Sequence, residues 1–486
     1  MKRITRRNFL KKSISTGISS TFAARAIIAA PNSQVLGANE QIRMAVIGLR
    51  GKGSHHISMF RDTPNVKVVA LCDVDKDVLA NGLAQLAETN LTADTYTDLR
   101  EVLDRKDIDA ISIATPNHWH ALASIWACQA GKDVYVEKPV SHNIWEGRKV
   151  VEAARKYKRI VQAGTQNRSD EGLKQALQYI KEGNIGKILF ARGLCYKKRL
   201  SIGKVDGPQP IPKSVDYNLW TGPAPMQPLM RKNLHYDWHW VWPTGNGDIG
   251  NQGIHEMDIC RWFIGQPKLA PKVMSIGGRF GYIDDGQTPN TQITLLDYKP
   301  APIIFEVRGL PRKKGEEAFI SSNYRGIQVG VVIHCEGGYF NGSWVYDNKG
   351  TKVKQFVRDG GGGHVDNFIK ALRSRKVSDL NADILEGHIS SSLCHMANIS
   401  HRIGSQATPD QIKQALKGNE DMLETFDRFN EHLTANEVCL SETKAVLGPT
   451  LQMQPLTETF EGTLSKEADK MLSRNYREPF VVPKKV

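Results

Sequence analysis

The sequence predicts a fold in two parts, α/β followed by α+β. From residue 42 onward, short β-rich runs alternate with segments of helical spacing, which is typical of a parallel sheet with helices on both faces. Beyond Gly164 this alternation ends and long irregular connections separate the strands. That change favours a mostly antiparallel sheet with flanking helices. With 486 residues, the chain is also too long for one core, so two domains are expected.

The first apolar run, residues 42–47, leads into a glycine-rich turn at residues 48–53 and then into the start of a helix. Backbone N–H groups and the positive helix end would then face one point, where a pyrophosphate fits. The outer glycines of a G-x-G-x-x-G pattern are present, but its middle position is Arg50. The second run, residues 66–72, ends in Asp73, which would accept hydrogen bonds from an adenosine ribose and repel a 2′-phosphate. We therefore expect a Rossmann domain that binds NAD, with NADP less favoured.

The remaining strands of this domain are expected at residues 107–114, 133–136 and 159–163, and its helices at 75–88, 98–105, 120–130 and 144–156. Ligands lie at the carboxyl ends of parallel strands. Two polar motifs occur at such ends, Thr115-Pro-Asn-His-Trp-His120 and Glu137-Lys138-Pro139. The first domain is assigned to residues 39–165.

The second domain, residues 166–440, is expected to bind the substrate. Its strands are predicted at residues 188–192, 293–296, 303–307 and 327–333, and its helices at 170–182, 365–374, 383–401 and 409–416. The tail, residues 441–486, is polar and is predicted to wrap the surface. A homo-oligomer is expected, because the second sheet would leave a face exposed.

The N-terminal segment is interpreted as an export signal, residues 1–38. Residues 5–11, Thr-Arg-Arg-Asn-Phe-Leu-Lys, resemble the twin-arginine motif and precede a Ser/Ala-rich stretch. Cleavage near Ala30 or Ala38 would suit this interpretation. Arg25 within the stretch argues against a membrane span. The predicted location is the periplasm, and the twin-arginine route carries folded proteins that already hold a cofactor.

The charge and the cysteines exclude two other classes of function. The net charge is +14, but seven basic residues and no acidic ones lie in residues 1–30, and no basic tract is interleaved with aromatic residues. Nucleic-acid binding is therefore not expected. The seven cysteines lie far apart without a C-x-x-C pair, so neither a metal site nor a disulfide framework is predicted.

Several motifs together resemble the Gfo/Idh/MocA oxidoreductase family. They are the loop at residues 48–53, Asp73, residues 114–120, residues 137–139 and Gly253-Ile-His255-Glu-Met-Asp258, in the family's order and spacing. The resemblance covers the chain from about residue 40 to the last helices. It implies a Rossmann domain, a C-terminal sheet domain and nicotinamide-dependent chemistry on sugars or cyclitols.

The candidate catalytic residues are Lys138, His255 and Asp258. An imidazole is suited to accept a hydroxyl proton near neutral pH, so His255 is the expected base. The resemblance implies a polarising or proton-transferring role for Lys138, whose ammonium would stabilise a forming alkoxide. Asp258, about one helical turn from His255, is expected to orient the histidine or a sugar hydroxyl.

The predicted cofactor-binding residues are Gly48, Arg50, Gly51, Lys52, Gly53, Asp73, Thr115, Pro116, Asn117, His120, Glu137, Lys138 and Gln166. His118 is also expected near the nicotinamide or its ribose. The predicted substrate-binding residues are Arg199, Tyr236, His239, Asn251 and His255. The aromatic segment 235–242 suits either core packing or stacking on a pyranose. His388 and His395, which share a helix face, are interpreted as packing or capping residues.

One position departs from the family pattern. Many sugar dehydrogenases of the family carry an Asp four residues before the histidine, where this chain has Asn251. A neutral amide can bind a hydroxyl but cannot act as a base. Asp248, in the preceding turn, is a candidate replacement.

Three functions remain open from the sequence. The main hypothesis is a periplasmic NAD-dependent oxidoreductase that acts on a secondary hydroxyl of a sugar or glycoside, with a tightly bound cofactor. The first alternative is a redox-neutral glycoside hydrolase or lyase that uses NAD catalytically. The second is a non-catalytic protein that binds a sugar or dinucleotide.

Overall fold

The computed structural model describes residues 41–316 and 322–486. The predicted export segment, residues 1–38, lies outside the described residues. Within the described ranges, none of the helices has both the length and the apolar character that a bilayer crossing requires.

The first domain contains a six-stranded parallel sheet in the order β3-β2-β1-β4-β5-β6. Its strands are β1 (Ile42–Ile47), β2 (Val66–Cys72), β3 (Asp94–Tyr96), β4 (Ala110–Ile113), β5 (Asp133–Val136) and β6 (Val161–Ala163). Its helices are α1 (Lys52–Arg61), α2 (Lys76–Ala87), α3 (Leu99–Asp104), α4 (Asn117–Gln129) and α5 (Ile144–Lys156). The strand order reverses between β1 and β4, which opens a crevice at their carboxyl ends. The expected Rossmann fold is confirmed.

The second domain is built on a larger sheet. The twelve described strands run β14-β13-β12-β11-β7-β10-β9-β8-β16-β15, and β17 and β18 join at β8. The pairing is antiparallel except between β7 and β10. The strands are β7 (Ile188–Tyr196), β8 (Lys272–Gly278), β9 (Thr291–Leu296), β10 (Ile303–Arg308), β11 (Val329–Cys335), β12 (Gly338–Phe340), β13 (Trp344–Asp347), β14 (Lys352–Gln355), β15 (Ser405–Ala407), β16 (Ala445–Leu447), β17 (Leu451–Gln454) and β18 (Thr459–Glu461). The expected mostly antiparallel sheet is confirmed.

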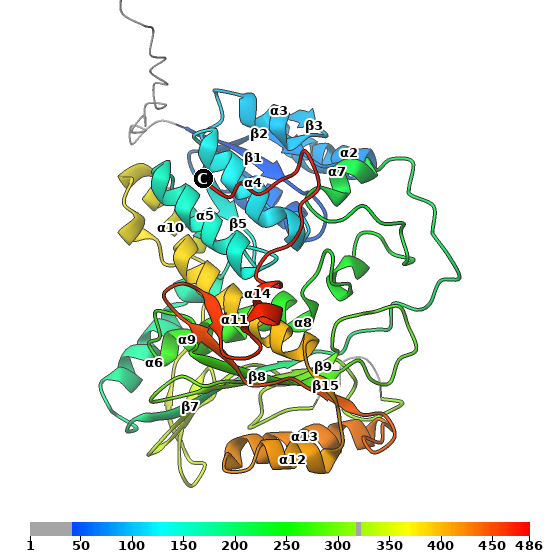
Figure 1. Ribbon diagram of the computed structural model, residues 1–486. Helices are drawn as coiled ribbons and strands as arrows, with labels where there is room; N and C mark the ends of the chain where they lie inside the picture. The colour runs from blue at the N-terminus through cyan, green and yellow to red at the C-terminus, as the bar shows by residue number, and fades with distance from the viewer. Residues whose placement is uncertain (1–40, 317–321) are drawn as a thin grey trace, which may run out of the picture. The chain divides into compact units, whose positions relative to one another are not determined.

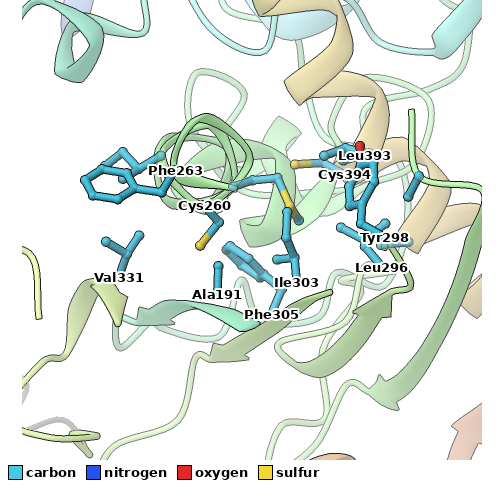
Figure 2. Close-up of a cluster of buried hydrophobic side chains, with 14 of the residues drawn as sticks. Ala191, Cys260, Phe263, Leu296, Tyr298, Ile303, Phe305, Val331, Leu393 and Cys394 are labelled. Atoms are coloured by element: carbon cyan, nitrogen blue, oxygen red, sulfur yellow. The ribbon is translucent and has the colours of Figure 1, made fainter. Parts of the chain in front are cut away.

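Helices cover both faces of this sheet (Figure 1). The helices of the second half are α6 (Glu171–Lys181), α7 (Tyr217–Thr221), α8 (Gly247–Asn251), α9 (Gly253–Phe263), α10 (His364–Ser374), α11 (Ile384–Arg402), α12 (Pro409–Ala415), α13 (Glu420–Ala435) and α14 (Ser465–Asp469). Figure 2 shows Cys260 and Phe263 of α9 against Ala191, Phe305 and Val331 of the strands, with Leu393 and Cys394 of α11 nearby. On the other face, Phe426 and Phe429 of α13 pack on Ile276, Ile293 and Ile304.

Helix α10 belongs to the Rossmann layer in space, although it lies in sequence within the second domain, between β14 and α11. Phe368 and Leu372 are buried in the same cluster as Ile42 and Met44 of β1. The ring of Tyr135 in β5 contacts Phe368 edge to face at 5.8 Å. The first domain is therefore completed by residues well beyond the predicted boundary at 165.

The tail corrects the prediction of a polar surface wrap. Residues 445–461 supply β16, β17 and β18 to the second sheet. Further on, Phe480 and Val482 are 1% exposed and pack in the Rossmann core, where Phe480 contacts the rings of Trp119 and Trp126. Single apolar residues of the tail are thus buried at intervals along it. The mostly polar composition of the segment gives no sign of this burial.

Candidate active site

The turn between β1 and α1 requires glycine at three positions. Gly48 and Gly51 have positive φ angles of 79° and 47°. A Cβ on Gly48 would lie 2.7 Å from the backbone nitrogen of Thr115, and one on Gly53 would lie 1.8 Å from the carbonyl oxygen of Gly48. A Cβ on Gly51, in contrast, meets nothing within 4 Å. The turn is therefore packed against β4 on one side and open on the other.

A cavity of about 530 Å³ lies at this edge of the parallel sheet. The structure brings all the predicted cofactor-binding residues to its wall except Gly53, which packs beneath Gly48. The predicted substrate residues Tyr236, His239, Asn251 and His255 line the same cavity. Residues that are far apart in sequence, such as Gly48 and His255, thus line one cavity.

Asp73 follows β2 directly and lies in the cavity wall. Its carboxylate accepts hydrogen bonds from the backbone N–H of Leu49 at 2.8 Å and of Asp75 at 3.0 Å. Burial raises the pKa of Asp73 to about 6, against the opposing effect of these N–H groups. Asp73 is therefore mostly ionised at pH 7 and fixed beside the glycine turn.

Glu137 and Lys138 follow β5 and occupy the floor of the cavity. The buried Glu137 carboxylate lies 3.1 Å from Nε2 of His56, whose Nδ1 lies 2.6 Å from the Ser112 hydroxyl. Although burial opposes ionisation, the His56 hydrogen bond, the charge of His56 and then the charge of Lys138 hold the pKa of Glu137 well below its usual range. Glu137 is thus a fixed negative charge beside the lysine.

The Lys138 ammonium donates a 2.9 Å hydrogen bond to the carbonyl oxygen of Asn251. Burial lowers the pKa of Lys138, while the nearby Glu137 charge raises it. A lysine with a lowered pKa is better able to give up and take back a proton near neutral pH.

His255 lies in the first turn of α9 and lines the cavity. Its Nδ1 atom has no hydrogen-bond partner among the described residues. Burial, followed by the charge of Lys138, lowers the pKa of His255 to about 3. The imidazole is therefore neutral over the ordinary working range, as a proton acceptor must be.

Asp248 is not free to replace the missing aspartate at position 251. Its carboxylate is 1% exposed and accepts hydrogen bonds of 2.9 and 2.8 Å from the Arg199 guanidinium. The Asn251 amide donates to the same carboxylate at 3.4 Å.

The structure corrects the expectation that Arg199 binds the substrate directly. Arg199 is not part of the cavity wall, and its guanidinium holds Asp248 and donates to the Tyr236 hydroxyl at 3.1 Å. It therefore acts on the cavity through Tyr236.

The structure also corrects the role expected for Asp258. Its carboxylate accepts hydrogen bonds from Arg168 at 2.8 to 3.0 Å and from the Ser390 hydroxyl at 2.6 Å. It is 1% exposed and lies outside the cavity wall, and no hydrogen bond joins it to His255. Asp258 therefore ties α9 to α11 through Ser390 and to the short helix at Gln166–Ser169 through Arg168.

The aromatic segment 235–242 contributes both to the core and to the cavity wall. Trp238 and Trp240 are buried, whereas Tyr236 is 45% exposed. The His239 ring stacks on Trp238 with a centroid distance of 3.6 Å and faces the cavity with Tyr236. The segment therefore provides both a core and an aromatic wall.

Ring nitrogens of four other histidines are engaged in hydrogen bonds within the protein. His120 lines the wall, but its nitrogens lie 2.6 Å from the oxygen of Pro139 and 2.7 Å from that of Thr115. His118 is buried and bonds to the oxygen of Trp220 at 3.0 Å. His388 bonds to Glu458 at 2.9 Å and His395 to the oxygen of Ser141 at 3.1 Å. The packing role predicted for the last two agrees with these contacts.

Two models of one protein family match this chain. The model described as "Oxidoreductase family, NAD-binding Rossmann fold" matches residues 42–165. The model described as "Oxidoreductase family, C-terminal alpha/beta domain" matches residues 187–324. Together they span more than half of the chain. The chain belongs to the Gfo/Idh/MocA oxidoreductase family. Its first domain is the NAD-binding Rossmann domain of that family.

Individual relatives resemble parts of the chain. Inositol 2-dehydrogenase of Salmonella paratyphi B is 32% identical over 157 residues, 32% of this chain and 46% of the relative. A protein named "Glycosyl hydrolase family 109 protein" from Shewanella sp. (strain W3-18-1) is 30% identical over 208 residues, 39% of this chain and 45% of the relative. The chain thus spans about half the length of these relatives.

Among solved structures, the WlbA dehydrogenase of Bordetella pertussis, in complex with NADH and UDP-GlcNAcA, is similar with a TM-score of 0.55. The sequences are 20% identical, and the match covers 74% of this chain and 97% of the other. The likeness supports the two-domain fold.

The residues of this Gfo/Idh/MocA protein fit a dinucleotide. No side chain caps the N-terminus of α1, so its first N–H groups remain for an anion, apart from that of Gly53, which donates to the Arg50 carbonyl oxygen at 2.8 Å. The open space beside Gly51 allows a pyrophosphate to approach the backbone. Thr115 Oγ1 and Gln166 Oε1 are buried and have no hydrogen-bond partner among the described residues. Gly48–Lys52, Asp73 and these two side chains would hold NAD, which accepts a hydride from a substrate carbon when bound.

Some residues of the site could not be found from the sequence. Thr97, Asp98 and Leu99 line the cavity after β3, a three-residue strand without an apolar pattern. Trp220 and His235 reach the wall from a long irregular connection. Near Lys138, buried Glu256 has one unpartnered carboxylate oxygen among the described residues, and burial raises its pKa to about 8. No spacing signal marks residues 97–99 or Trp220 as site residues, whereas His235 and Glu256 stand within the aromatic segment 235–242 and the motif at 253–258 without being singled out.

Proposed function

We propose that this protein is an NAD-dependent oxidoreductase that removes a hydride from a secondary hydroxyl-bearing carbon of a sugar or glycoside. The observation that carries the proposal is the convergence of Lys138 and His255 in the cavity that begins at the glycine turn. The names of the dehydrogenase relatives support the substrate class.

The two residues have complementary tasks. His255 is neutral and lies in the cavity wall with an unpartnered Nδ1, so it can accept the substrate hydroxyl proton. The Lys138 ammonium, held at the Asn251 carbonyl, stabilises the negative charge that develops on the oxygen. Tyr236 and His239 offer an aromatic wall for the apolar face of a sugar ring, and Asn251 offers an amide for its hydroxyls.

A second candidate is a redox-neutral hydrolase or lyase that cleaves a glycoside with catalytic NAD. The similarity to the glycosyl hydrolase family 109 protein favours it. The two candidates leave different products. An oxidoreductase produces a keto sugar and NADH, whereas the redox-neutral enzyme produces a cleaved glycoside and no net NADH.

The test is a panel of sugars and glycosides incubated with the purified protein and NAD. NADH fluorescence is followed and the products are identified by mass spectrometry. A keto sugar formed with NADH supports the oxidoreductase, and cleavage without NADH supports the alternative. A protein that binds both ligands and converts neither would be the non-catalytic binding protein, and the proposal would fail.

We further propose that the protein works in the periplasm. The twin-arginine-like residues 5–11 support this location. Replacing Arg6 and Arg7 by lysine is expected to keep the protein in the cytoplasm, as measured by fractionation of the producing cells.

A further inference from the structure

One long connection of the second domain reaches across to the Rossmann domain. We call residues 211–240 the cover segment; it lies between β7 and α8 and contains α7. Val215 of this segment forms an isolated antiparallel bridge with Asp75, which follows β2 of the Rossmann sheet. The residues on either side of the bridge exchange two backbone hydrogen bonds of 3.0 and 2.9 Å.

A second attachment uses the same residue of the Rossmann domain. The Asp75 carboxylate lies 2.9 Å from Nε2 of His235, near the other end of the cover segment. Asp75 is 4% exposed and also caps α2 by accepting a hydrogen bond from Asp77 N–H at 3.0 Å. A single fixed side chain, two residues from Asp73, therefore holds the segment at a point far from Val215 in sequence.

Two further contacts hold the middle of the segment. The Trp119 indole donates to the oxygen of Leu219 at 3.0 Å, and a Cβ on Gly222 would lie 2.2 Å from the same ring. From the tail, the Arg477 guanidinium donates to the oxygens of Asn218 at 2.6 and 2.7 Å and to that of Gly222 at 3.1 Å.

The cover segment has an apolar cluster of its own and is not a loose surface loop. Val215, Trp220, Leu229, Leu234 and Trp238 are buried together. Val74, the Rossmann residue next to Asp73, packs against this cluster. Opening the segment would therefore expose apolar side chains as well as break hydrogen bonds, so openings are expected to be infrequent.

The segment also forms part of the NAD cavity. Leu219, Trp220 and His235 share the wall with Asp73 and with residues 97–99. In a Rossmann domain, the carboxylate after the second strand contacts the adenosine ribose. Leu219, Trp220 and His235 of the cover segment thus lie at the adenosine end of the cavity. Lys138 and His255 mark the reacting end, which the last residues of the segment, Tyr236 and His239, also reach.

We propose that the cover segment closes the adenosine end of the cavity, fastened by the Asp75–Val215 bridge and the hydrogen bond from His235 Nε2 to the Asp75 carboxylate, and that NAD leaves only when this fastening opens. NAD is then a retained cofactor and not a co-substrate exchanged at each turnover, so the NADH that forms returns its hydride on the enzyme, either to a second carbonyl substrate or, in the redox-neutral alternative, to the oxidised sugar. The inference rests on the proposed NAD-dependent function and adds the residues that control cofactor release.

A reversible cross-link tests the proposal. Asp75 and Val215 form the non-hydrogen-bonded type of antiparallel pair, whose Cα atoms lie about 4.5 Å apart, within the range of a disulfide. The double variant Asp75→Cys/Val215→Cys is loaded with NADH and then oxidised. Displacement of the NADH by excess NAD is followed by the loss of NADH fluorescence, and the same sample is measured again after reduction.

The oxidised holoenzyme is expected to release NADH at least tenfold more slowly than the reduced one. The reduced variant, which lacks the Asp75 carboxylate, is expected to release it faster than the wild type. Wild-type protein treated with the same oxidant controls for its own cysteines, of which Cys439 is exposed. Equal release rates in the two redox states would overturn the proposal.

A second variant avoids any change to the bridge. His235→Leu removes the hydrogen bond to Asp75 and is expected to raise the release rate several-fold, with thermal unfolding measured to verify the fold. Lys232→Gln, on the exposed side of the same segment, is the matched control and should release NADH at the wild-type rate. Equal release rates for His235→Leu and the wild type would show that the Asp75–His235 hydrogen bond does not fasten the segment. A protein that binds no NAD in any form would contradict the proposed function itself, which the release experiment distinguishes from a failure of the cover.

Discussion

The Lys138 ammonium donates a hydrogen bond of 2.9 Å to the main-chain oxygen of Asn251. The side chain at position 251 is where this chain departs from many sugar dehydrogenases of its family. Because the acceptor is a backbone atom, the departure leaves the anchorage of the lysine intact. It changes only the group that faces a substrate hydroxyl, from a carboxylate to an amide.

Replacing the lysine tests its assigned role. Lys138→Met keeps most of the side-chain volume but removes the ammonium. General acid–base groups contribute about 10²–10⁴-fold in rate, so kcat is expected to fall on that scale. The melting temperature and the NAD content should stay near wild type, and Lys187→Met, on the surface, should leave kcat unchanged. Retained activity in Lys138→Met would refute the role.

Asp73 is expected to set the preference for NAD. Asp73→Ser removes the charge that repels a 2′-phosphate, while Arg50 remains in the same wall to attract it. The ratio of the Kd values for NADP and NAD is expected to fall by roughly 10- to 100-fold, about 1.4 kcal/mol for each factor of ten. Titration of both cofactors, monitored by fluorescence, measures it.

The same residue predicts a pH dependence of that preference. The pKa of Asp73 is raised to about 6, so its charge is lost as the pH falls through this value. Wild-type discrimination against NADP should therefore weaken from pH 7 toward pH 5. Discrimination that is constant over this range would argue against Asp73 as its source.

Asp258 is expected to stabilise the fold rather than to take part in the chemistry. Asp258→Asn removes the buried partner charge of Arg168, itself 7% exposed, and leaves it the partly exposed Glu386 at 3.0 Å. Loss of one member of such a pair lowers the free energy of unfolding by about 3–5 kcal/mol, measurable by urea titration. The kcat of the folded protein should change only modestly. A variant of wild-type stability with kcat reduced 100-fold or more would restore the catalytic role expected from sequence.

Buried histidines predict that the protein is less stable in mild acid. Burial lowers the pKa values of His118 and His395 to about 3, against 6.5 in the unfolded chain. Between these values the unfolded state binds more protons, so the free energy of unfolding falls by up to about 1.4 kcal/mol per pH unit for each histidine. Glu256, with its pKa raised to about 8, contributes stability that is complete below 4.5 and lost as the pH rises through 8, and so opposes this trend.

Several other histidines have lowered pKa values, so the acid-destabilising direction should prevail; they are His142, His239, His255, His334, His364, His401 and His432. Urea unfolding of the wild type at pH 7 and pH 5 measures the slope. His395→Gln, which keeps an N–H donor for the Ser141 oxygen, should reduce it. A wild-type protein equally stable at both values would contradict the prediction.

The Rossmann domain could be predicted closely because its strands carry a local signal. The runs at 42–47 and 66–72 are apolar, buried on both faces and bounded by turn residues, so the pattern and the structure coincide. Strand β3 was missed because its three residues are polar and partly exposed at the sheet edge. Helix α13 was also missed, although its apolar residues have helical spacing and a strong amphipathic pattern.

The sequence predicts site residues only where they directly follow a strand or belong to a recognised motif. Asp73 and Lys138 directly follow β2 and β5, and topology brings strand ends together. Which residue a side chain pairs with depends on the tertiary structure, and the spacing of residues in the sequence does not indicate it. Arg199 is expected in the site as a substrate contact and Asp258 from its spacing to His255, although each is committed to a buried ion pair.

The most direct test of the account follows deuterium from substrate to cofactor. Purified protein that holds NAD is incubated with sugars and glycosides deuterated at every carbon, then denatured, and the released dinucleotide is analysed by mass spectrometry. The account predicts reduced dinucleotide that carries one deuterium, formed by the wild type and not by Lys138→Met, although both hold the cofactor. Dinucleotide without deuterium after incubation with every member of the panel would contradict hydride transfer at this site.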